Sequence, residues 1–322
     1  MIIVEDYRGC YGDALERYYN FEDFSDGSDN KVLFHGMGTV ETPECKAQYK
    51  GYDKKAFWNL EQPAAWYGGD KNYMVTSANI DKYFQKIMTI CPYTSEWLNS
   101  MHNSDVFVPS FMPFGERHVH HGKEDKIYDV IYWGHISSQT HLNFIDAMKS
   151  FKYNFLSLGL DYWHQEFRNS GHGEYITAVN LPREDMWSLL RKTKICLITN
   201  CAYLTDQQIK NVKSIKGWKQ CGAFSHIDQG SVPQYKTRMI ESAVNRTLML
   251  VKRNPWKVDE MWFEPGKDFI YFEKDEELPN LIEHITTNWH QYESIVENAF
   301  VKATTRYTVK NFINLVKENL DD

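Results

Sequence analysis

The chain has 322 residues, of which 42% are hydrophobic and 25% charged, and its formal net charge at pH 7 is −7. This length exceeds one ordinary core and suits two medium-sized domains, and the composition is that of a folded rather than a disordered protein. The negative charge disfavours a general nucleic-acid binder, which needs a broad surface of lysine and arginine.

The first part of the chain alternates short apolar runs with amphipathic stretches, which is the pattern of an α/β fold built on a parallel sheet. Two of its predicted strands lead into polar residues that can deprotonate a hydroxyl group, His35 and Glu61. The simpler interpretation of each is a polar residue at the end of a strand whose hydrogen bonds are satisfied within the protein. The strands are predicted at residues 1–5, 31–35, 55–60 and 105–108, and the helices at residues 11–19, at residues 81–88 and from Thr94 or Ser95 onward.

A polar, charged tract at residues 116–127 follows Pro113 and Gly115 and reads as a linker. It separates a predicted first domain, residues 1–115, from a second domain, residues 128–300. The linker histidines have no cysteine or carboxylate at metal-ligand spacing, so we interpret this tract as a solvated loop rather than a metal site. These histidines are His118, His120 and His121.

The α/β pattern restarts after the linker, and its first strand ends at Gly134. Ser137 and Ser138 follow at the start of a helix, so backbone N–H groups and two hydroxyls can cradle a phosphate there, although an ordinary N-cap by either serine is the alternative. Asn200 ends a later strand and either reaches a base or ribose or is a plain polar strand end. Strands are predicted at residues 128–134, 153–158, 195–199 and 248–251, and helices at 142–148, 187–190, 239–243 and along 276–320.

Six cysteines are scattered without a Cys-x-x-Cys pair, which predicts free thiols in a reducing compartment. The first residues lack the basic and long apolar regions of a signal peptide. No apolar run reaches the roughly 18 residues of a membrane span. We therefore expect a cytoplasmic protein without a membrane span.

An ordered set of motifs lies between residues 234 and 278: Arg238, Glu241 three positions on, an apolar strand, and then Phe263-Glu264-Pro265-Gly266 and Glu276-Glu277-Leu278. In this order they resemble the group-1 glycosyltransferases, especially the spore-maturation-like branch, over about residues 128–310. The resemblance implies a GT-B fold, with two Rossmann-like domains facing a cleft and a helix at residues 301–322 that crosses back to the first domain.

The resemblance also implies an activity: transfer of a hexose or pentose from a nucleotide-sugar donor, with UDP- or GDP-sugar favoured, to a hydroxyl of a glycan, lipid-linked or protein acceptor. No metal cofactor is expected. Arg238 would fork onto phosphate oxygens and stabilise the leaving diphosphate. Glu241 would accept hydrogen bonds from ribose hydroxyls, with Ser242 beside it. The alternative for Arg238 and Glu241 is a surface salt bridge at helical spacing.

Retaining members often carry a second glutamate eight positions before Glu241, and here that position is Pro233. The stereochemistry is therefore open, and an inverting enzyme would take its base from the first domain, where His35 and Glu61 are the candidates. A glycosyltransferase acting on DNA bases is a variant that the net charge disfavours. A non-catalytic sugar-nucleotide-binding module is the alternative from another class. A Rossmann dehydrogenase is excluded because no G-x-G-x-x-G follows an early strand.

Overall fold

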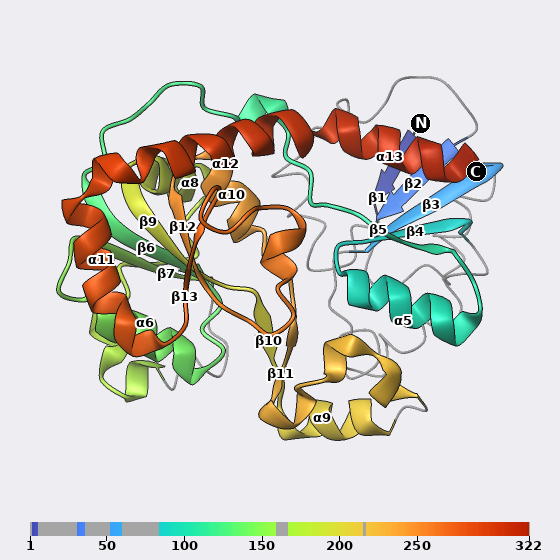
Figure 1. Ribbon diagram of the computed structural model, residues 1–322, viewed down its shortest axis with the longest axis horizontal. Helices are drawn as coiled ribbons and strands as arrows, with labels where there is room; N and C mark the ends of the chain where they lie inside the picture. The colour runs from blue at the N-terminus through green and yellow to red at the C-terminus, as the bar shows by residue number, and fades with distance from the viewer. Residues whose placement is uncertain are drawn as a thin grey trace. The chain divides into compact units, whose positions relative to one another are not determined.

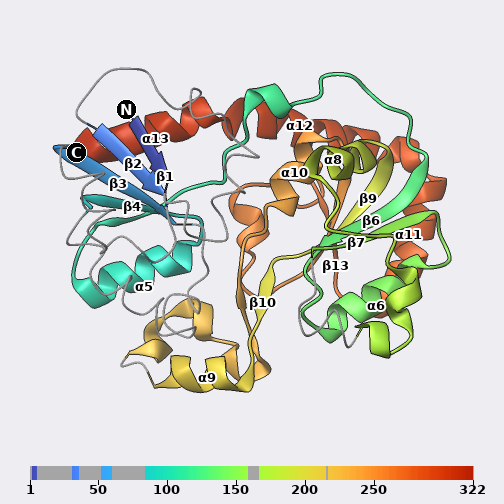
Figure 2. The ribbon, with the colours of Figure 1, turned by 180° about the vertical axis from the view of Figure 1, so that it is seen from behind.

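The computed structural model describes residues 2–5, 31–35, 52–59, 84–158, 167–214 and 217–321. Its contacts divide the chain into two compact units. Each unit contains a parallel sheet (Figure 1 and Figure 2). Glu61 and the helix predicted at residues 11–19 lie outside the described residues. The first unit comprises residues 1–118, 201–235 and 306–322, and the second comprises residues 119–200 and 236–305.

The described strands of the first unit form a parallel sheet in the order β1-β2-β3-β4-β5, which confirms the four strands predicted there. The helix predicted at residues 81–88 is wrong, because residues 86–89 form β4 between β3 and β5. Ile87 and Met88 are both fully buried, and a short run buried on both faces carries no clear period. The strands are β1 (Ile2–Glu5), β2 (Lys31–His35), β3 (Lys54–Asn59), β4 (Lys86–Thr89) and β5 (Phe107–Pro109).

Segments from distant parts of the sequence cover the two faces of this sheet. Helix α5 (Pro92–His102) begins at Pro92, two residues before the predicted start, because proline is well suited to the first helical turn. On the other face, α13 (Val309–Asp321) packs against β3 and β4, with the rings of Trp58 and Phe312 4.7 Å apart. The C-terminal helix is therefore part of the first unit.

The face that α5 covers also receives an excursion of the chain, residues 201–235, which leaves the second unit after β9. Its strands β10 (Cys201–Tyr203) and β11 (Ser231–Pro233) pair antiparallel with each other, and α9 (Asp206–Lys213) lies between them. Phe224 packs edge-on against Trp97 of α5 at 4.9 Å. This arrangement differs from the single second domain, 128–300, that the sequence suggested, because the apolar residues of the excursion join the core of the first unit.

The second unit has a parallel sheet in the order β13-β12-β9-β6-β7-β8. The chain runs from β6 to β7 and β8 on one side and then crosses to β9 on the other side of β6. Ligands of open α/β sheets bind at the carboxyl ends of the strands where the order reverses, which here means the ends of β6 and β9. The strands are β6 (Tyr128–Gly134), β7 (Tyr153–Ser157), β8 (Ala178–Val179), β9 (Thr193–Thr199), β12 (Leu248–Lys252) and β13 (Ile270–Phe272).

Both faces of this second sheet are covered by helices (Figure 1). Alternate side chains of β6 and β9, such as Val130 and Leu197, join α6 and α11 in one apolar core. Helices α8 and α10 contact β9 and β12 from the other side. The predicted helices are confirmed as α6 (Gln139–Met148), α8 (Arg183–Arg191), α10 (Arg238–Val244), α11 (Leu278–Thr287) and α12 (Glu293–Arg306).

The described cysteines are Cys91, Cys196, Cys201 and Cys221, and all four are free thiols. Burial raises the pKa of the Cys196 and Cys221 thiols to about 12. Neither is therefore a reactive thiolate at neutral pH. In the part of the chain that the structure describes, no helix is both long enough and apolar enough to cross a bilayer.

Replacing Phe224 by alanine tests whether the excursion belongs to the core of the first unit. Phe224 is 2% exposed, so Phe224→Ala should lower the free energy of unfolding by about 3–5 kcal/mol, measured by urea denaturation. The control is Val301→Ala, which removes an apolar side chain that is 50% exposed. Equal effects of the two substitutions would show that the excursion does not contribute to the core.

Candidate functional site

The carboxyl end of β6 is shaped by a close contact between Gly134 and Arg238. Gly134 has φ +140°, and a Cβ atom added to it would lie 2.2 Å from Nη2 of Arg238. Only glycine, which has no Cβ atom, leaves room for the guanidinium here, and the positive φ angle also favours glycine. The first residue of α10 is thereby brought against the end of the central strand, as the phosphate-site prediction requires.

The guanidinium of Arg238 is buried among aromatic rings, with 7% of the residue exposed. Its Cζ lies 4.9 Å from the ring centre of Tyr132 and 5.5 Å from that of Trp133, both on β6. These cation–π contacts stabilise the charge in part. Within the described residues, however, Nη1 is buried and has no hydrogen-bond partner. Such a donor is costly unless a ligand accepts from it.

Glu241 lies one turn further along α10 and is fully buried. Its Oε1 accepts hydrogen bonds from Nη1 of Arg183, at 3.0 Å, and from Nε1 of Trp187, at 3.3 Å. The surface salt bridge considered for Arg238 and Glu241 is therefore wrong, because both are buried and the partner of Glu241 comes from α8. Arg183 also stacks on Trp133, with its Cζ 5.2 Å from the ring centre. The role of Glu241 toward ribose stays a prediction.

The turn between β6 and α6 is organised by a buried histidine, His141. Its Nδ1 lies 3.3 Å from the backbone nitrogen of Ser137 and 3.0 Å from Oγ of Ser138. Because the Ser137 N–H donates, Nδ1 is the acceptor and Nε2 carries the proton. Ser138 holds the N-cap position of α6, but its side chain makes no capping bond. The side-chain N-cap considered for it is therefore wrong, and in the first turn of α6 the N–H of His141 donates instead to the backbone oxygen of Ser138, at 3.1 Å.

Positive charge collects around this turn. Burial lowers the pKa of His141 well below its ordinary value, and the nearby charges of Arg238, Lys236 and Lys252 lower it further. Lys252 is compensated by Asp275, at 2.8 Å. An anion bound near the start of α6 would be stabilised by the charge of Arg238.

Asn200 directly follows β9, and its side chain forms hydrogen bonds within the second unit. Its Oδ1 accepts from the backbone N–H of Lys236 at 2.9 Å, and its Nδ2 donates to Asp259. Asp259 is fully buried and also accepts from Asn254, at 2.8 Å, and Tyr271, at 3.0 Å. Burial raises the pKa of Asp259 against the opposing effect of these hydrogen bonds. Asn200 thus fixes the loop that leads to Arg238, and its contact with a base or ribose stays a prediction.

The remaining predicted site residues are Ser242, His35 and Glu61, and the structure describes the first two of them. Ser242 is fully buried, and its hydroxyl has no hydrogen-bond partner among the described residues. His35 is the last residue of β2, and its catalytic role stays a prediction, like that of Glu61. Among the described residues, no group of three or more His, Cys, Asp or Glu side chains is arranged to hold a metal ion.

Sequence reasoning missed Arg183, Trp187 and His141. Arg183 and Trp187 lie more than fifty positions before Glu241 and reach it only through the packing of α8 on α10. His141 did carry a signal, since it stands three residues after Ser138 at the start of a predicted helix, a spacing that brings the two side chains together.

Comparisons with known proteins agree with this architecture. A family model described as glycosyl transferase-like matches residues 139–317. A glycosyltransferase from Rickettsia africae ESF-5 is 12% identical with a TM-score of 0.58, covering 99% of this chain and 90% of that one. HepE from Anabaena, in complex with UDP-glucose, is 11% identical with a TM-score of 0.60, covering 90% and 78%. No curated protein sequence matches the chain.

TarM of S. aureus is 10% identical with a TM-score of 0.57. The match covers 91% of this chain but only 55% of TarM, so the chain spans about half the length of that protein. Similarity at this level of identity carries the fold alone. The predicted GT-B fold of parallel α/β units with a helical C-terminal tail is confirmed.

Substituting Gly134 tests the contact with Arg238. Gly134→Ala should destabilise the protein by about 1–3 kcal/mol, because the methyl group collides with the guanidinium and the φ angle is strained. In an Arg238→Ala background the same substitution should cost about 1 kcal/mol less, as measured by a double-mutant cycle of thermal unfolding. Strict additivity would mean that the two residues are not in contact.

The pH dependence of stability tests the environment of His141. In the unfolded chain it titrates near 6.5, and in the folded protein well below that value. The unfolded state therefore binds more protons than the folded state once the pH falls below 6.5, so the free energy of unfolding should decrease on acidification from that point. His141→Phe should flatten this fall in urea denaturation. The exposed His290→Ala is the control and should leave the profile unchanged; an unaltered profile in His141→Phe would contradict the buried neutral histidine.

Proposed function

The chain belongs to the glycosyl transferase-like family, and from this premise we propose that it transfers a sugar from a nucleotide-sugar donor to a hydroxyl of a glycan or glycoconjugate. The donor site is the turn of Gly134, Ser137 and Ser138 together with Arg238 of α10. The supporting observation is the buried Nη1 of Arg238, which has no partner among the described residues and belongs to the guanidinium that meets Gly134 at the end of β6.

The chemistry of nucleotide-sugar transfer suits these groups. As the glycosidic bond to the donor breaks, negative charge grows on the departing diphosphate. A buried guanidinium and preorganised N–H groups stabilise that charge more strongly than water does, because they need no reorganisation at the moment of reaction. In this proposal they take the role that a divalent cation has in other transferases, and no metal cofactor is needed.

Arg183 and Trp187 are positioning residues in this proposal. Through Glu241 they hold the start of α10, and with it Arg238, at a fixed distance from β6. Arg183 also stacks on the ring of Trp133, which lies on β6. A displacement of about an ångström in such a frame is enough to lower a rate substantially.

The ligands of the similar structures favour a uridine nucleotide. HepE was solved with UDP-glucose, and a pneumococcal O-GlcNAc transferase, GtfA, was solved with UDP and GlcNAc. We therefore propose a UDP-sugar as the donor. The acceptor hydroxyl would be deprotonated by a base of the first unit, for which His35 and Glu61 remain the proposed residues.

Titration of UDP and UDP-glucose by calorimetry tests the donor site. Arg238→Ala should weaken UDP binding by about tenfold to a hundredfold, which corresponds to the loss of charge-assisted hydrogen bonds. The matched control is Arg306→Ala, because Arg306 is exposed at the end of α12. Binding that is equal in wild type and Arg238→Ala would overturn the assignment of the site. UDP binding without hydrolysis or transfer of any UDP-sugar would favour the non-catalytic module instead.

A further inference from the structure

A cavity of about 440 Å³ lies in the second unit at the amino ends of β6, β9 and β12. Gly134 ends β6, so the cavity is at the opposite edge of the sheet from the proposed donor site. Its volume is that of pockets that hold small molecules. One wall is residues 120–126, and the others are the end of α8, the turn after α10 and the start of α12 with Trp289.

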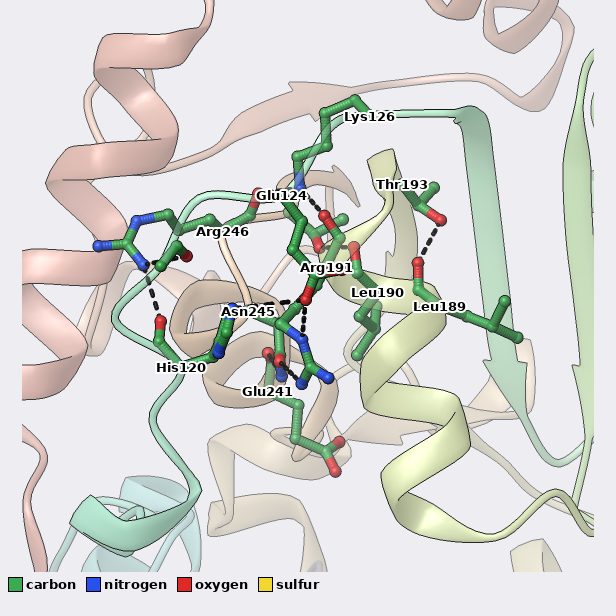
Figure 3. Close-up of polar contacts among 12 residues, drawn as sticks. His120, Glu124, Lys126, Leu189, Leu190, Arg191, Thr193, Glu241, Asn245 and Arg246 are labelled. Atoms are coloured by element: carbon green, nitrogen blue, oxygen red, sulfur yellow. Dashed lines mark hydrogen bonds and ion pairs between the residues drawn. The ribbon is translucent and has the colours of Figure 1, made fainter.

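Two arginines hold the linker wall in place (Figure 3), although most of its residues, His120, His121, Gly122, Lys123 and Asp125, are exposed, as expected of a solvated loop. Nη1 of Arg246 donates to the backbone oxygen of His120 at 2.9 Å. Nε of Arg191 donates to Glu124 at 2.6 Å. The cavity is therefore bounded by ordered groups on the linker side, which is a condition for selective binding.

Most charges that line the cavity are neutralised by a neighbour. Arg191 pairs with Glu124, and Lys194 with Asp129. Arg246 pairs with Glu297, at 3.1 Å. Two further carboxylates, Asp125 and Glu293, are exposed, so water and salt screen them.

Lys126 is the exception. Its Nζ donates to the backbone oxygens of Arg191, at 2.7 Å, and Arg246, at 2.6 Å, at the ends of α8 and α10 (Figure 3). Within the described residues it forms no ion pair with a carboxylate. Burial lowers its pKa to about 7, and Glu124 opposes this only in part. The protonated form of Lys126 has three donors, of which the two carbonyls use two. An anion in the cavity that accepts from the third donor would also favour this protonated form.

The aromatic and apolar groups of the cavity indicate what would carry that anion. Trp289 is half-buried and Val296 is 5% exposed, and both line the cavity. A flat ring can stack on the indole of Trp289 while a carboxylate reaches Lys126. We propose that this cavity binds a small aromatic carboxylate, with Lys126 as its counter-ion and Trp289 as its stacking partner.

Calorimetric titration of indole-3-carboxylate tests the proposal, with indole-3-carboxamide as an uncharged ligand of the same shape. The carboxylate should bind saturably at millimolar or lower concentration, and the carboxamide about tenfold more weakly. Arg238→Ala should bind the carboxylate like the wild type, because the donor site is at the other edge of the sheet. Failure of the donor-site proposal therefore does not affect this outcome.

Two variants locate the binding. Lys126→Met should weaken binding of the carboxylate about tenfold, and circular dichroism verifies its folding, since it also removes a group that caps two helix ends. Val296→Phe fills the cavity and keeps Lys126, so it should abolish binding; Val301→Phe, at an exposed position of α12, should not. The proposal is overturned if wild type shows no saturable binding, if both ligands bind equally, if Val296→Phe binds normally, or if Arg238→Ala loses binding.

Discussion

The contact of the Arg238 guanidinium with the Cα atom of Gly134 is the constraint on which the candidate site depends. It requires a glycine at the end of β6, with φ +140°, and an aromatic surface, supplied by Tyr132 and Trp133, that receives a buried cation. It also requires that α10 be held at a fixed position relative to β6. The buried Glu241 does this by accepting a hydrogen bond from Arg183 of α8. The result is a preorganised cation whose free donor suits the charge of a diphosphate.

Helices α8 and α10 connect the two edges of the second sheet. At the carboxyl edge they bring Arg183, Glu241 and Arg238 to the proposed donor site. At the amino edge their last carbonyls carry the negative end of each helix dipole, and Lys126, Arg191 and Arg246 collect there. The opposite ends of the two helix dipoles thus favour anions at the carboxyl edge and cations at the amino edge. The proposed carboxylate site at the amino edge uses Lys126, for which the described residues provide no ion pair.

Neither compact unit is one continuous stretch of the chain. Residues 201–235 and 306–322 leave the second unit and complete the core of the first, where Phe224 packs on Trp97 of α5 and Phe312 packs on Trp58 of β3. The excursion begins directly after Asn200 and ends directly before Lys236, and the hydrogen bond between these two residues closes it at its base. The loop that carries Arg238 is therefore anchored independently of the excursion.

The sequence by itself determined the strands of the two parallel sheets except β4, β8 and β13, together with the Gly134 turn and the motif of Arg238 and Glu241, because these depend on local apolar runs and on short spacings. It also supported the GT-B resemblance, through the order of motifs along one stretch. Only the tertiary structure decided that 86–89 is a strand, that residues 201–235 join the first unit, that Arg183 pairs with Glu241, and that Lys126 faces a cavity. Each of these depends on contacts between residues far apart in the chain, and the periodicity of a single segment contains no information about its distant partner.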